Sequence, residues 1–95
     1  MVKVKTPKGT FEYFLSGRKD KKLAVLVDGH LIHFGQFPYE HYFDRTGLLD
    51  PSWNHLDKER RKRYLQRSLS IADKFGRFTS EDVLSPNYHS IHILW

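Results

Sequence analysis

The 95-residue sequence predicts an α+β domain, in which a small antiparallel sheet of three to four strands is covered by one long basic amphipathic helix and a short C-terminal helix. Three observations predict this fold. Apolar and polar residues alternate over residues 1–35, an apolar stripe of helical period runs through residues 55–74, and a serine–proline pair precedes the apolar C-terminus. The length suits one modest core, and 39% hydrophobic residues argue against disorder. We therefore expect a single domain over residues 1–95.

Residues 1–35 predict a β-meander. The first strand alternates valine with lysine, and the second, over residues 10–15, carries aromatic side chains on both faces. Residues 22–27 form the most apolar strand. Asp28 and Gly29 are typical of a two-residue hairpin turn, after which residues 31–34 return as the last strand.

Residues 36–54 combine aromatic side chains with turn residues. The aromatic residues between positions 37 and 43 predict a short helix with Tyr39, Tyr42 and Phe43 on one side. Asp50 followed by Pro51 indicates a further helical turn, because proline is favoured at the first position of a helix.

The main helix is predicted over residues 55–74. Asn54 is placed to cap its start, and Asp57 lies in the first turn, where a negative charge meets the positive end of the helix dipole. Gly76 is expected to end the helix. The predicted apolar stripe contains Tyr64, Leu65, Ser68, Leu69, Ile71 and Ala72.

Residues 75–95 predict a loop and then a short C-terminal helix. Ser85 is a suitable N-cap, and Pro86 is a suitable first helical residue. One face of the helix would hold Tyr88, Ile91, His92 and Trp95, and the same segment also alternates as a strand does. The apolar end of the chain must be buried against its own core or against a partner.

The charge pattern favours an anionic partner. The net charge is +5, and the sequence pI is about 9.6. Residues 1–22 carry a net charge of +5 and residues 55–67 one of +4, whereas residues 23–54 carry −3. Nucleic acid is the commonest partner for such a pattern. The other interpretation is a basic surface that only keeps the domain soluble.

The predicted nucleic-acid-binding residues lie mainly on the main helix. Arginine binds phosphate through two parallel hydrogen bonds, and a tyrosine such as Tyr39, Tyr42 or Tyr64 can stack on an exposed base. The predicted set is Lys58, Arg60, Arg61, Arg63, Tyr64 and Arg67, together with Lys3 and Lys5.

Motifs for catalysis or metal binding are missing from the sequence. It has no cysteine, and it contains no P-loop, GxSxG, GxGxxG or HExxH pattern. His89 and His92 are spaced to ligate a metal together, but no further ligands accompany them. We therefore predict no catalytic residue, no metal and no cofactor. A small metal-dependent nuclease that uses His55 and Asp57 is kept as an alternative.

Three blocks of residues form a combined pattern. The first covers residues 27–35, VDGHLIHFG, and continues through Tyr39, Tyr42, Asp44, Thr46 and Gly47. The second holds His55, Asp57, Arg60, Arg61, Tyr64 and Arg67, and the third holds Ser85, Pro86, Tyr88, His89, Leu94 and Trp95. From about Lys22 onward, the chain resembles a family of small uncharacterised proteins of tailed phages and large DNA viruses. It departs from that family at Ser68, where other members often have histidine.

The resemblance implies a viral protein and transfers no activity. The motif residues without a predicted role are Asp28, Gly29, His33, Phe34, Gly35, Tyr39, Tyr42, Asp44, His55 and Asp57. The favoured function is a small basic viral accessory protein that binds the phosphate backbone of nucleic acid through its arginine-rich helix, without catalysis. A virion-associated structural or interaction protein is the alternative, and the nuclease is third.

The expected location is intracellular. The sequence has no apolar run long enough for a membrane span and no signal-peptide core at its start. We therefore expect a protein of the host cytoplasm or nucleus, or of the virion, that is neither secreted nor bound to a membrane.

Overall fold

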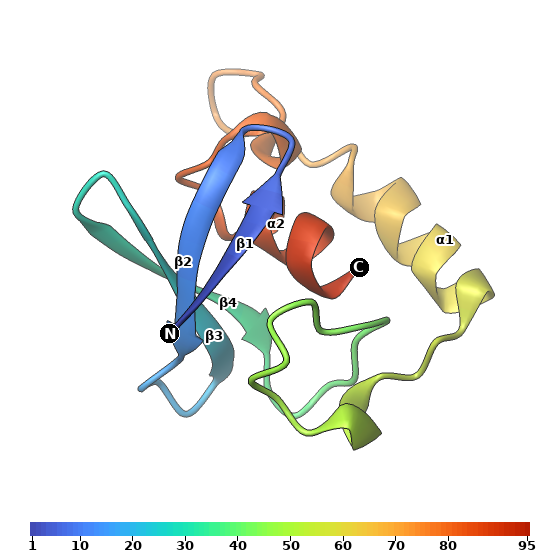
Figure 1. The fold of residues 1–95 in the computed structure, drawn as a ribbon. Coiled ribbons are helices and arrows are strands. Elements are labelled where there is room, and N and C mark those ends of the chain that lie inside the picture. Colours follow the sequence, from blue (N-terminus) through green and yellow to red (C-terminus); the bar gives the residue numbers. More distant parts are fainter.

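The computed structural model describes residues 1–95, and the N-terminal half forms a four-stranded antiparallel sheet (Figure 1). The strands are β1 (Val2–Thr6), β2 (Gly9–Leu15), β3 (Lys21–Val27) and β4 (His30–Gln36). They lie side by side in chain order, and each pairs with the next in an antiparallel register. The predicted meander is therefore confirmed, with four strands.

The hairpin between β3 and β4 turns at Asp28 and Gly29. Both residues have positive φ angles, 48° and 80°. This conformation suits a two-residue hairpin turn, because it matches the twist of the flanking strands. Val27 pairs directly with His30 across the turn. The two motif residues Asp28 and Gly29 thus have a role in the fold.

The C-terminal helix covers the sheet. It begins with α2 (Pro86–His89) and continues as a π-helical turn, Ser90–Leu94. The Ser85 hydroxyl caps it by accepting the Asn87 N–H at 3.2 Å. The main core contains Tyr13, Leu23, Val25, Val27, Ile32 and Phe34 of the sheet, and Ile93 and Leu94 of this helix. The prediction of a helix here is confirmed, and the strand alternative is wrong.

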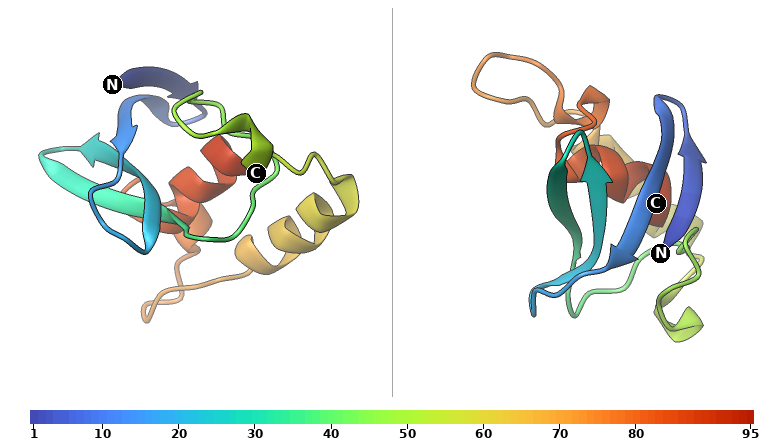
Figure 2. Two further views of the ribbon diagram at one scale, coloured as in Figure 1. Left: turned by 90° about the horizontal axis from the view of Figure 1, so that it is seen from below. Right: turned by 60° about the vertical axis from the view of Figure 1, so that its left-hand side comes forward.

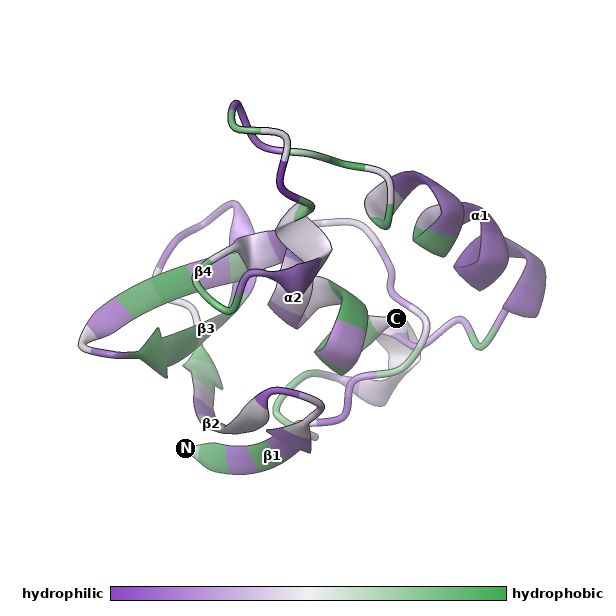
Figure 3. Cartoon of the chain, turned by 90° about the horizontal axis from the view of Figure 1, so that it is seen from above, coloured by the Kyte–Doolittle hydropathy of each residue, from purple (hydrophilic) through white to green (hydrophobic).

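The basic helix is shorter than predicted and does not lie on the sheet. Helix α1 spans Lys58–Ser68, which is 11 residues. In Figures 1 and 2 the C-terminal helix lies between α1 and the sheet. Figure 3 shows that most of α1 is hydrophilic, so this helix has only a narrow apolar side to bury. The prediction of a long helix over residues 55–74 as the cover of the sheet is therefore wrong.

A side-chain cap marks the start of α1, and a backbone bridge follows its end. Asp57 caps its start by accepting the backbone N–H groups of Glu59 and Arg60. Asn54, the expected cap, hydrogen-bonds elsewhere in the fold. Beyond Leu69 the chain leaves the helix, and Ala72 forms an antiparallel bridge with Phe78. The outer part of the predicted apolar stripe, at Leu69, Ile71 and Ala72, is consequently exposed.

The aromatic segment after β4 forms a turn and then an irregular stretch, so the short helix predicted between residues 37 and 43 is wrong. The peptide bond between Phe37 and Pro38 is cis. His41 forms a parallel bridge with Asn54, and the backbone N–H of His41 donates to Trp53. The pairing with residues 53–55 satisfies backbone groups that a helix would have used internally. The turn predicted after Asp50 is present as a 3-10 helix, Pro51–Trp53.

Replacing Gly35 by alanine is expected to destabilise the protein by roughly 1–3 kcal/mol. Gly35 has a φ of +76°, and an added Cβ would lie 2.8 Å from Cδ1 of Leu94, which is in the core. Urea unfolding measures the effect. Gly17→Ala is the matched control, because Gly17 has no heavy atom within 4 Å of an added Cβ and no positive φ. Equal stability of the two variants would contradict the prediction.

Candidate functional site

A cleft of about 1260 Å³ lies between α1 and the end of the sheet formed by β3 and β4. The residues along it come from four parts of the fold. The sheet contributes Lys21, Lys22, Phe34, Gly35 and Gln36, and the segment after it contributes Tyr39, Glu40 and His41. Helix α1 and the residues after it contribute Arg60, Arg63, Tyr64, Gln66, Arg67, Ser70 and Ile71. The C-terminal helix and the last residue contribute Pro86, Asn87, Ser90, Leu94 and Trp95.

The cleft is strongly basic. Five lysine or arginine side chains line it, against a single carboxylate, that of Glu40. Glu40 pairs with Arg60 at 3.2 Å, whereas Lys21, Arg63 and Arg67 form no ion pair. Cations that face each other across a cleft create a positive potential that attracts an anionic ligand.

A chain of hydrogen bonds links three residues of the cleft lining, Lys22, Tyr39 and His41, to the loop behind them. Asn54 Oδ1 accepts the backbone N–H of Asp44 at 2.9 Å and also contacts His41 Nε2 at 2.7 Å. An amide oxygen only accepts, so His41 Nε2 carries the proton, and Nδ1 presents its lone pair. Lys22 Nζ donates to that Nδ1 at 3.1 Å and also to the carbonyl of Tyr39. The chain holds the segment after β4 against the sheet.

Burial changes the proton affinity of both members of the Lys22–His41 pair. Desolvation lowers the pKa of Lys22 to about 8, although the charges of Glu40 and Asp44 partly oppose it. Burial is also the main cause of the lowered pKa of His41, and the nearby Lys22 charge adds to the effect. Near neutral pH, Lys22 is therefore mostly charged and His41 is neutral, as their hydrogen bond requires.

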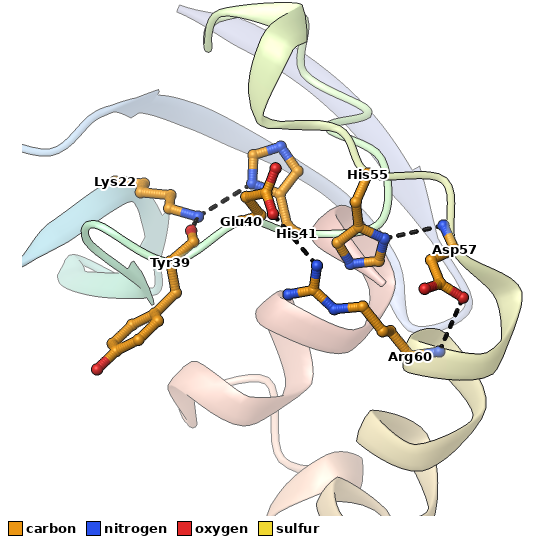
Figure 4. Close-up of polar contacts among 7 residues, drawn as sticks. All are labelled: Lys22, Tyr39, Glu40, His41, His55, Asp57 and Arg60. Atoms are coloured by element: carbon orange, nitrogen blue, oxygen red, sulfur yellow. Dashed lines mark hydrogen bonds and ion pairs between the residues drawn. The ribbon is translucent and has the colours of Figure 1, made fainter.

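Figure 4 shows the polar contacts beside the cleft at the start of α1, where Glu40 and Arg60 line the cleft and His55 and Asp57 do not. His55 Nδ1 accepts the backbone N–H of Asp57 at 2.9 Å, and the ring packs 5.1 Å from that of Trp95. The His55 Nε2 atom is buried and has no hydrogen-bond partner. Burial, and secondly the charge of Arg60, lower the pKa of His55. The imidazole is therefore a neutral donor at pH 7.

The cleft brings together half of the predicted binding residues. Arg60, Arg63, Tyr64 and Arg67 line it, as do the motif residues Phe34, Gly35 and Tyr39. Tyr64 stacks on Trp95 with ring centroids 4.0 Å apart, so one face of its ring is already covered. Tyr39 is 64% exposed, which leaves its ring accessible to a ligand.

The other predicted binding residues lie outside the cleft. Lys3 and Lys5 are on β1, at the opposite edge of the sheet, and Lys58 is absent from the cleft lining. Arg61 donates from Nε to the carbonyl of Trp95 at 2.8 Å and lies over the ring of Tyr42. Arg61 therefore anchors the C-terminus to α1.

Most of the remaining motif residues also have roles in the fold. His33 Nδ1 contacts the hydroxyl of Ser16 at 2.8 Å. The Asp44 carboxylate accepts the backbone N–H groups of Thr46 and Leu49, which fixes the loop between them. Asp57 caps α1. Tyr42 packs against both His55 and Arg61.

Sequence reasoning missed Lys21, Lys22 and His41 as cleft residues. The two lysines stand at the start of the most apolar strand, and a buried lysine there needs hydrogen-bond acceptors. A lysine pair at the start of an apolar strand was therefore the sequence signal for Lys21 and Lys22. No such signal marked His41, because its hydrogen-bond partners come from distant positions in the chain.

No group of three or more histidine, cysteine, aspartate or glutamate side chains is arranged to hold a metal ion. His89, one of the two histidines with metal-ligand spacing, contacts the Tyr13 hydroxyl through Nδ1 and the Val83 carbonyl through Nε2. Its two nitrogens are therefore both engaged within the core.

Comparisons with protein-family models, with curated proteins and with solved structures find no match in any of the three. None of the helices combines the length and apolarity needed to cross a membrane.

Proposed function

We propose that the protein binds nucleic acid by its phosphate backbone, in the cleft between α1 and the sheet. The observation that carries the proposal is the charge of the cleft, which has five cationic side chains and one carboxylate. Three of the cations, Lys21, Arg63 and Arg67, form no ion pair and are available to phosphates. The proposal includes no catalytic step.

The arrangement of the cations suits a single strand. Lys21 and Lys22 come from β3, and Arg63 and Arg67 come from α1, so a strand in the cleft meets cations from two elements of the fold. Tyr39 adds an exposed ring on which a base can stack. Phosphate contacts of this kind bind without strong choice of sequence. The resemblance to phage and viral proteins supports the further proposal of a viral accessory role.

Binding is tested by replacing Lys21, Arg63 and Arg67 together with glutamine. The wild-type protein is expected to bind a fluorescent single strand with an affinity that falls steeply with salt. The triple variant should bind more weakly, and the slope of log affinity against log salt should become shallower by roughly two, at about 0.7 for each lost phosphate contact. Fluorescence anisotropy at several salt concentrations measures both quantities.

The matched control replaces Lys3, Lys5 and Lys58 with glutamine. It removes the same charge from positions outside the cleft. The control should keep most of the affinity and of the salt slope. Equal losses in the two variants would show that net charge, and not the cleft, accounts for binding, and no binding at low salt would reject the proposal.

A protein partner is the second candidate function, and one observation favours it. Large apolar side chains are exposed after α1, among them Phe75 at 71% and Phe78 at 53%. Exposed apolar side chains in one region are typical of surfaces that contact other proteins. A role in virion structure or assembly would use this region. It would be favoured if the protein failed to bind either single or double strands.

A further inference from the structure

One buried hydrogen-bond donor beside the cleft has no acceptor. Because His55 Nδ1 accepts the backbone N–H of Asp57, the proton of the neutral imidazole is on Nε2. That Nε2 atom is buried and makes no hydrogen bond. A buried donor without a partner carries a desolvation cost that a bound acceptor would remove. The position is therefore suited to an acceptor atom supplied by a ligand.

In the view of Figure 4, the Arg60 guanidinium lies on the Nε2 side of the His55 ring, with the Glu40 carboxylate on the other side of Arg60. The charge of Arg60 also acts on the proton affinity of His55. An anion with several oxygens can accept a charge-assisted hydrogen bond from a guanidinium and a second bond from a neutral donor.

In this structure the Glu40 carboxylate forms an ion pair with the Arg60 guanidinium. Its Oε1 atom lies 3.2 Å from Nη1 of Arg60, and the two side chains are 47% and 42% exposed. Such an exposed pair is weak, because water screens it. A phosphate offers several oxygens with localised negative charge, so it can bond to the guanidinium and also reach a second donor. Phosphate can therefore displace the carboxylate.

We propose that His55 Nε2 and the Arg60 guanidinium form a phosphate-binding subsite beside the cleft, next to its lining residues Glu40 and Arg60, where the Glu40 carboxylate competes with the phosphate. The inference rests on the proposed function, since the phosphate would be one of the backbone phosphates of the bound strand. The three residues thereby have distinct roles. His55 and Arg60 donate to the phosphate, and Glu40 lowers the affinity of the cleft until it is displaced.

The first experiment replaces Glu40 with glutamine and compares it with Glu12→Gln. Glu12 also pairs with a lysine, Lys3, at 3.9 Å, but it lies on β2 outside the cleft. Both variants add one positive unit to the net charge. With a fluorescent oligothymidylate that lacks terminal phosphates, Glu40→Gln should bind roughly three- to fivefold more tightly than Glu12→Gln. The further change Arg60→Gln should remove this gain, and equal affinity of the two variants would overturn the proposal.

The second experiment uses inorganic phosphate and does not depend on nucleic-acid binding. NMR spectra of the Glu40→Gln protein are followed as phosphate is added at constant ionic strength. The His55 ring signals and the indole signal of Trp95, whose ring lies 5.1 Å from that of His55, should shift with saturation. They should shift less in Glu12→Gln, where the carboxylate of Glu40 still competes.

The two experiments separate failure of the subsite from failure of the proposed function. If the protein binds the oligonucleotide but phosphate leaves the His55 signals unchanged, the subsite is wrong and the cleft proposal stands. If phosphate shifts those signals but no oligonucleotide binds, the subsite is correct as an anion site and the nucleic-acid proposal is wrong.

Discussion

Removal of Leu94 and Trp95 is expected to unfold the protein. Leu94 is 1% exposed and belongs to the main core. Its carbonyl accepts the backbone N–H groups of Tyr42 at 3.0 Å and Phe43 at 3.1 Å, so it also holds the segment after β4. Trp95 stacks on Tyr64 and accepts a hydrogen bond from Arg61, which ties α1 to the rest of the fold.

The expected loss of stability combines the core contribution of Leu94 with its two backbone hydrogen bonds and the stacking of Trp95 on Tyr64. Truncating a buried leucine to alanine costs about 2–5 kcal/mol, and a small domain has about 5–15 kcal/mol in total. Loss of the whole residue, its two backbone bonds and the Trp95 stack should consume most of that stability. Circular dichroism and thermal unfolding measure the outcome.

The control for this prediction is a comparison of two single substitutions. Leu94→Ala should destabilise the protein by several times more than Leu84→Ala, because Leu84 is 46% exposed. A truncated protein that unfolds as cooperatively as the wild type would contradict the prediction. It would indicate that the C-terminus serves an interface and not the core.

Stability is expected to fall as the pH is lowered from about 6.5 toward 5. Burial is the main cause of a lowered pKa for His41, His55, His89 and His92 in the folded protein. The unfolded chain, with histidine pKa values near 6.5, then binds more protons than the folded chain in this range. The stability from these neutral histidines is present above pH 6.5 and is lost as the pH falls through their folded pKa values.

His89 is expected to contribute strongly to this pH dependence. It is fully buried, and its Nδ1 atom contacts the Tyr13 hydroxyl at 2.9 Å, while Nε2 donates to the Val83 carbonyl at 2.7 Å. Protonation of Nδ1 would remove the acceptor for the Tyr13 hydroxyl and place a charge in the core. Each such group changes the free energy of unfolding by up to about 1.4 kcal/mol per pH unit.

Urea unfolding between pH 5 and 8 tests the second prediction. His89→Gln should lower stability at pH 8 and should make the dependence on pH shallower, because glutamine does not titrate. His30→Gln is the control, since His30 is exposed beside the β3–β4 turn and should leave both quantities unchanged. A stability that is constant across this pH range in the wild type would contradict the prediction.

Features with strong local causes were predicted correctly. The hairpin at Asp28 and Gly29 depends on two adjacent residues that tolerate positive φ. The start of the C-terminal helix depends on a serine cap followed by Pro86. In both cases, the residues that choose the conformation are neighbours in the chain.

The errors arose where distant residues compete for the same groups. Asn54 looks like a helix cap, but its side chain bonds to His41 and to the backbone of Asp44. Residues 69–72 continue the helical period, but the bridge between Ala72 and Phe78 takes the chain out of the helix. The spacing of apolar residues predicts which face of an element is apolar. It does not predict which other element will pack against that face.

Alternation, turn residues and helical spacing are local properties, and they were sufficient to predict the α+β class, the meander and the row of arginines on α1. They did not predict that the C-terminal helix covers the sheet, or that Lys21, Lys22 and His41 line one cleft with Arg63 and Arg67. These features depend on burial, which is a property of the assembled core. A short apolar helix removes more apolar surface from water than a charged one, so it takes the sheet face and leaves α1 outside.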